Sequence, residues 1–197
     1  MPISPGFTNC EFGLETNTQR TLESPLTRNV QRVDLSGDRW TAIYSLPKMN
    51  RRQAAAWKSF FLRCQGSANA FFGYDPDCAY PLGLATGTPL VKGGSQSGST
   101  LNIDGCTPNV TGWMLAGDYF EVNGELKQLT ADASTNGSGE TTLAFQPPLR
   151  SSPGDNAPLT VQKASCTMIL IDDQQGKWRC DKNGIYEEKT FSAIEVF

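Results

Sequence analysis

The chain has 197 residues, with 17 lysines and arginines against 20 aspartates and glutamates and no histidine, so its formal net charge is −3. This length supports one large domain or two small ones with a hydrophobic core of their own. The charge balance disfavours nucleic-acid binding, and no stretch approaches the roughly 18 apolar residues of a membrane span. Without histidine, Ser-His-Asp and Cys-His catalytic sets are excluded within the chain.

The sequence of residues 1–45 predicts extended segments separated by turns. The first five residues lack the basic and apolar regions of an export signal, so we expect the protein to mature in a reducing compartment. Residues 39–46 are rich in aromatic and β-branched side chains and end at Pro47, which predicts a strand.

A helix is predicted over about 51–64. Asn50 suits its N-cap, and Gln53 stands three residues later as in a capping box. Gly66 is a suitable stop. Apolar residues recur at helical spacing on one side, at Ala54, Trp57, Phe61 and Cys64.

A run rich in glycine and serine at 93–99 marks a change in the composition of the chain and in the secondary structure that it predicts. Short strands are predicted after it, near 100–103, 118–122, 125–130 and 141–145. Asn123-Gly124 between two of them predicts a hairpin with a type I′ turn. The tail returns to longer strands at 166–171, 177–180 and 190–197.

These elements predict a mainly β protein with one helix, of the α+β class. Residues 1–90 and 161–197 would form one body, and residues 91–160 would be a small β-barrel inserted into it. An insertion requires Val91 and Thr160 to lie close together. The body's core is expected to contain five large apolar residues: Trp40, Trp57, Phe61, Ile169 and Ile194.

Two kinds of residue in this chain suggest ligand or substrate chemistry. Trp113, Tyr119 and Phe120 either fill the small barrel or stack against a sugar ring. Paired carboxylates suit acid–base hydrolysis of glycosides, but each pair here lies in a polar stretch where such residues also form turns. The pairs are Asp75 and Asp77, Asp172 and Asp173, and Glu187 and Glu188.

Six cysteines are spread along the chain without a C-x₂-C pair. Four-cysteine zinc sites usually contain such close pairs, because one turn supplies two ligands. We therefore expect buried free thiols, with disulfides second and a metal site third, and we predict no cofactor.

Several short segments, taken in order and spacing, resemble the distal tail proteins of siphophages and related phage-like elements. The resemblance covers most of residues 35–197. The segments are Arg39-Trp40, Ser45-Leu46-Pro47, 53–61, 66–71, Asp75-Pro76, Pro81-Leu82-Gly83, 93–98, Gly112-Trp113, Gly117-Asp118-Tyr119, 147–150, Ser152-Pro153 and 191–195.

The resemblance implies a structural protein rather than an enzyme, and it transfers no catalytic residues. Such proteins form a homo-oligomeric, hexameric ring in the virion tail tip, between the tail tube protein and the hub, near the tape measure protein. They assemble in the host cytoplasm. Their body is β-sandwich-like with a helix, and the small β domain is OB-like. Two other functions stay open for this chain: a glycan- or host-surface-binding module of the tail tip, and a carboxylate-dependent wall hydrolase.

Overall fold

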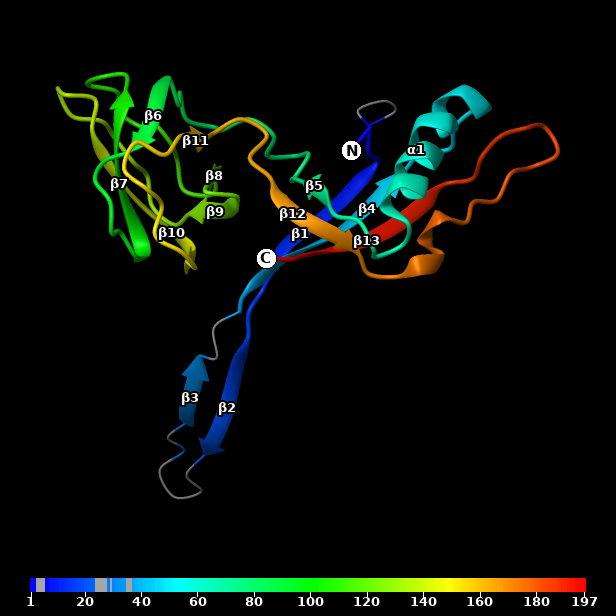
Figure 1. Cartoon of the computed structure of the whole chain (residues 1–197), viewed down its shortest axis with the longest axis horizontal. Coiled ribbons are helices and arrows are strands. Elements are labelled where there is room, and N and C mark those ends of the chain that lie inside the picture. Colours follow the sequence, from blue (N-terminus) through cyan, green and yellow to red (C-terminus); the bar gives the residue numbers. More distant parts are fainter. Residues whose placement is uncertain (3–5, 24–27, 29, 35–36) are drawn as a thin grey trace.

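The computed structural model describes residues 1–2, 6–23, 28, 30–34 and 37–197. It contains a five-stranded sheet, a six-stranded sheet and a two-stranded hairpin, with one α-helix among the described residues. Figure 1 shows the six-stranded sheet curled at one end of the molecule and the helix with the five-stranded sheet at the other. The predicted class, mainly β with one helix and a barrel-like second unit, is confirmed.

The five-stranded sheet, called the main sheet below, takes its strands from both ends of the chain. Its neighbouring strands are all antiparallel and follow the order β1-β4-β13-β12-β5. The bounds are β1 Asn9–Glu15, β4 Arg39–Leu46, β13 Lys189–Glu195, β12 Cys166–Leu170 and β5 Phe71–Gly73.

The helix α1 spans Arg51–Cys64, as predicted. Asn50 and Gln53 form the expected capping box: each side-chain oxygen accepts the other residue's backbone N–H, at 3.0 and 3.1 Å. The helix ends where Gln65 adopts a left-handed conformation with φ 50°. Its apolar side covers one face of the main sheet, here called the inner face, through Ala54, Trp57, Phe60, Phe61 and Cys64.

Three of the five expected core residues, Trp40, Trp57 and Phe61, lie in this inner core. For Ile169 and Ile194 the prediction is wrong. Side chains alternate along a strand, and β12 turns Met168 and Leu170 inward, so Ile169 points to the opposite, outer face. Ile194 pairs with Ile169 on that same outer face and is only half-buried.

The six-stranded sheet, called the barrel-like unit, has the order β11-β8-β9-β10-β7-β6. Its bounds are β6 Gly87–Val91, β7 Gly98–Cys106, β8 Tyr119–Val122, β9 Glu125–Leu129, β10 Thr141–Leu149 and β11 Leu159–Thr160. A bridge between Leu90 and Pro158 brings its two edges together. Asn123 and Gly124 have φ 54° and 77°, which confirms the type I′ turn. The two ends of this unit meet, since Val91 N donates to Ala157 O at 2.9 Å.

The sequence missed the short strands β6 and β11 at these meeting edges. It also predicted a strand at 177–180, where the structure has none: a 3₁₀ helix, η1 (Asp173–Gly176), precedes a loop with isolated bridges only.

A third feature, called the arm, is the hairpin of β2 (Thr18–Glu23) and β3 (Val30–Asp34), which projects away from both sheets (Figure 1). No helix in the described part of the chain is long and apolar enough to cross a membrane.

Candidate interaction surfaces

The three aromatic residues considered for sugar stacking are all buried. Trp113 and Phe120 are fully buried in the core of the barrel-like unit, and the Trp113 Nε1–H donates to Thr86 O at 2.8 Å. Tyr119 belongs to the inner core, with its ring centroid 5.5 Å from that of Trp40. None of these rings offers a face to a ligand, so the glycan-binding hypothesis has no aromatic platform here.

The paired aspartates hold backbone turns. Asp75 accepts the N–H of Asp77 at 3.0 Å, and Asp172 caps η1 by accepting the N–H of Gln174 at 2.8 Å. Asp173 accepts both the N–H and the hydroxyl of Ser67, each at 2.9 Å, and these hydrogen bonds lower the pKa of its carboxyl. Asp75 and Asp172 therefore have the turn-forming role that such residues commonly have, whereas Asp173 links η1 to Ser67 after α1.

All six cysteines are free thiols. Burial raises the pKa of Cys10 to about 12, and nearby Asp75 adds to the shift. Burial likewise raises the pKa of Cys78 and of Cys106 to about 11. These thiols stay protonated at neutral pH and are weak nucleophiles. The described residues hold no cluster of three or more His, Cys, Asp or Glu side chains suited to a metal ion.

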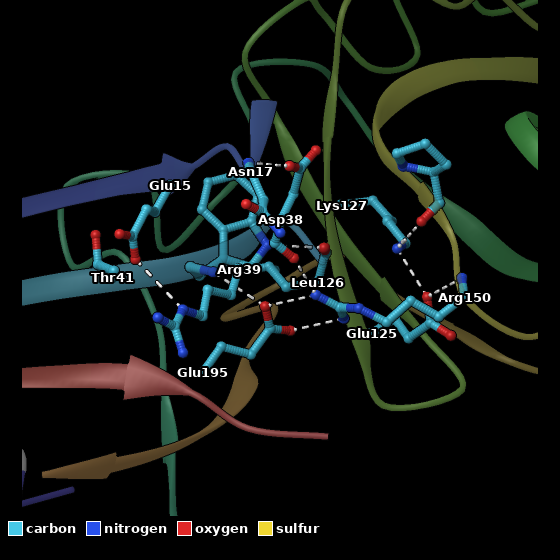
Figure 2. A network of polar contacts seen from close by, with 12 residues as sticks. Glu15, Asn17, Asp38, Arg39, Thr41, Glu125, Leu126, Lys127, Arg150 and Glu195 are labelled. Carbon is cyan, nitrogen blue, oxygen red and sulfur yellow. Dashed lines mark hydrogen bonds and ion pairs between the residues drawn. The ribbon is translucent and has the colours of Figure 1, made fainter. Parts of the chain in front are cut away.

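A network of charged side chains joins the barrel-like unit to the main sheet (Figure 2). At its barrel end, buried Lys127 lies 2.7 Å from the Glu125 carboxylate and donates to Pro148 O at 2.8 Å. Glu125 also accepts the N–H of Arg150 at 3.0 Å and the N–H of Ser151 at 3.1 Å. Every oxygen of this carboxylate is therefore occupied.

Arg150 continues the network to the main sheet and to the base of the arm. Its guanidinium forms a two-pronged pair with Glu195 at the end of β13, at 2.9 and 3.0 Å, and donates to Asp38 O at 2.7 Å. The Glu195 carboxylate also accepts the N–H of Trp40 at 3.0 Å, and the Phe197 ring lies 3.7 Å from the guanidinium carbon. One arginine thus ties three parts of the fold together.

The electrostatics of this network suit a structural link. Burial alone would raise the pKa of Glu125, but the hydrogen bonds from Arg150 and Lys127 outweigh it and the pKa is lowered. Burial lowers the pKa of Lys127, and its pairing with Glu125 opposes the shift. Lys127 lies 2.7 Å from Glu125 and Arg150 lies 2.9 Å from Glu195, so the network links the barrel-like unit to the main sheet.

The outer face of the main sheet carries a group of apolar side chains among polar ones such as Thr41, Thr167 and Ser192. Phe72, Ile171 and Ile43 are 69%, 55% and 39% exposed there. Ile169 and Ile194 lie side by side between them, on neighbouring strands. None of these five side chains packs against either core cluster. Exposed apolar patches of this kind usually mark contacts with other molecules.

A second exposed apolar feature lies on the segment between β5 and β6. Tyr80, Leu82 and Leu84 alternate outward along it and are 61%, 79% and 67% exposed. We call these three side chains the ridge.

No family model matches this chain, and no curated protein matches it.

Proposed function

We propose that this chain is a structural subunit of a phage tail tip that assembles into a hexameric ring at the distal end of the tail tube and joins the tube to the tail-tip hub. Its partners are further copies of itself, the tail tube protein and the hub protein, with the tape measure protein nearby. The role is architectural and involves no catalysis.

The observation that carries this proposal is the outer face of the main sheet. Strands that are covered on both faces read as nearly continuous apolar runs, and β12 with its next residue reads Cys-Thr-Met-Ile-Leu-Ile over 166–171. Only Met168, Leu170 and Cys166 are covered within the chain. The other half of the run, with Ile169 and Ile171, has the composition of a surface that a partner protein such as the tube or hub protein covers.

Two further features support an assembly role. The arm projects away from the place where the main sheet and the barrel-like unit meet, and another subunit can reach it there (Figure 1). The Arg150–Glu195 pair holds the barrel-like unit at a set orientation to the main sheet. A rigid subunit presents its contact surfaces at a constant angle, which a closed ring of identical copies requires.

The proposal is tested first on particles. Purified tails are examined by mass spectrometry and by negative-stain microscopy with a gold-labelled antibody against this chain. We expect the label at the tail tip and six copies per tail. A chain that is absent from the particles contradicts the proposal. Gene order gives an independent test: a tape-measure gene upstream and a hub gene downstream are expected.

The outer face is tested by a single substitution in the same particles. Ile169→Asp places a charge in the middle of the apolar face and is expected to abolish incorporation into tails. Thr88→Asp, at an exposed position of β6, is the matched control and should be incorporated normally. Circular dichroism of both purified variants checks that the fold is kept.

A further inference from the structure

The ridge is held rigidly by the backbone that carries it. The buried Asp118 carboxylate accepts the N–H groups of Leu82 at 2.7 Å and Gly83 at 3.1 Å. Ala85 N donates to Trp113 O at 2.7 Å, and Lys163 N donates to Ala79 O at 2.6 Å. The segment is therefore held by four backbone groups, three of which bond to the barrel-like unit and one to Lys163 after β11.

Gly83 shows how closely this segment lies against the barrel-like unit. A Cβ at this position would come within 2.5 Å of Trp113 O, so no side chain fits on the inward side. The large side chains of Tyr80, Leu82 and Leu84 all point outward instead. Apolar side chains on a fixed backbone bind with little loss of conformational entropy, which is the property of a pre-organised anchor.

A concave counterpart lies on the far part of the molecule, between the second half of α1 and η1. This groove has a volume of about 470 Å³. Phe61 and Leu170 form its apolar floor, and Leu62 stands at its rim with 76% of its side chain exposed. Lys58 and Lys177 also line it.

The two surfaces differ in charge. Besides Lys58 and Lys177, a third ammonium lies at the groove, because Lys189 Nζ donates to Lys177 O at 2.8 Å and sits 5.7 Å from the Phe61 ring centroid. Asp173 is the acidic residue of the lining. The groove is therefore positive, and it is apolar at its centre.

The ridge has the opposite balance. Asp75 and Asp77 precede it by five and three residues, and Lys163 Nζ lies 6.0 Å from the Tyr80 ring centroid. Two acidic residues thus precede the three exposed apolar side chains in the chain, and one basic group lies at Tyr80. An exposed apolar feature preceded by acidic residues and a concave, basic, apolar one therefore occur on different parts of the same chain.

We propose that the ridge of one copy docks into the groove of the next copy, with Leu82 and Leu84 against Phe61 and Leu62. Because the two surfaces are different, the contact is heterologous, and repetition of such a contact closes into a ring when the rotation allows. This inference rests on the proposed ring function and names the contact by which copies join.

The test uses two variants that each remove one side of the contact. Leu62→Asp spoils the groove and keeps the ridge, whereas Leu82→Asp spoils the ridge and keeps the groove. Both residues are largely exposed, so the fold is kept, which circular dichroism checks. Each variant should associate with itself at least about 30-fold more weakly than the wild type in sedimentation velocity, the size expected for a lost hot-spot residue.

The decisive measurement is the equimolar mixture. The intact ridge of a Leu62→Asp copy should bind the intact groove of a Leu82→Asp copy and give a dimer that grows no further. Ile185→Asp changes an exposed apolar residue outside both surfaces and should assemble like the wild type. Asp77→Lys should weaken association about two- to five-fold, as expected for a charge pair at the edge of a contact.

Two results with the variants would overturn the docking contact: single variants that assemble like the wild type, or a mixture that stays monomeric. A wild-type chain that stays monomeric at about 200 μM, a concentration at which even weak complexes form, would also overturn it. If tails nevertheless carry a ring of this chain, the ring function stands and only this contact fails. If the mixture forms the capped dimer but tails lack the chain, the contact stands and the phage function fails.

Discussion

The inner and outer faces of the main sheet are built from the same five strands, yet only the inner face is completed within the chain. Inward side chains meet α1 and form an aromatic cluster, in which the Phe191 ring centroid lies 5.2 Å from that of Phe61 and 5.9 Å from that of Trp57. Outward side chains such as Ile169 and Phe72 touch neither core. Apolar residues of the same strands therefore contribute to the core of the folded chain on the inner face but not on the outer face.

The largest effect is expected from the inner face. Trp57→Ala should lower the free energy of unfolding by about 3–5 kcal/mol, because it leaves a large cavity between α1 and the sheet. Phe72→Ala removes an exposed ring from the outer face and should change that free energy by less than about 0.5 kcal/mol. Chemical denaturation followed by circular dichroism measures both. Equal losses would mean that the outer face also belongs to the monomer's core.

A similar loss is expected at the barrel end of the charged network, where Glu125 and Lys127 lie on β9. Lys127→Met leaves the buried Glu125 carboxylate without its ion-pair partner and should cost about 3–5 kcal/mol. The pair of Lys92 and Glu140 has the same 2.7 Å separation but is exposed on the barrel-like unit. Lys92→Met should therefore cost less than about 1 kcal/mol. If urea unfolding gave the same loss for both variants, the buried Lys127–Glu125 pair would contribute no more to stability than the exposed Lys92–Glu140 pair.

Adjacent residues of β12 give the most direct comparison of the two faces. Met168→Ala removes a fully buried side chain and should cost about 2–5 kcal/mol. Ile169→Ala, one residue along on the outer face, should cost about 1 kcal/mol or less, the range of strand propensity. The same thermal-unfolding experiment measures both variants. A reversed order would reverse our assignment of the two faces.

The smallest effect is expected on the free energy of unfolding at acid pH. The pKa of Glu125 is lowered in the folded state from its ordinary 4.5, so this carboxylate stabilises the fold above that value. Its contribution is lost as the pH falls through the lower, folded-state pKa. The unfolding free energy of the wild type should thus fall more steeply below pH 4.5 than that of Glu125→Gln, which has no group to titrate there. Parallel pH profiles would contradict a stabilising role for the charged carboxylate.

Local signals in the sequence determined the elements that depend on neighbours in the chain. The helix at 51–64 was predictable because its cap, its apolar spacing and its stop all lie within 17 residues, from Asn50 to Gly66. Asn123-Gly124 determined its turn in the same way, since both residues tolerate positive φ. The change of composition at 93–99 lies between β6 and β7, so it indicated the start of the barrel-like unit only to within one strand.

Only the tertiary structure decided which face of each strand is covered and which distant groups meet. Ile169 and Met168 are both apolar. Side chains alternate along a strand, and the sequence of β12 does not indicate which of these two residues points inward. Arg150 meets Glu195 across 45 residues, and Glu195 meets Trp40 across 155. Such pairs leave no local pattern, because their spacing follows from how the sheets pack. The ridge arises likewise, since Asp118 reaches Leu82 across 36 residues and holds its backbone so that the side chain faces out.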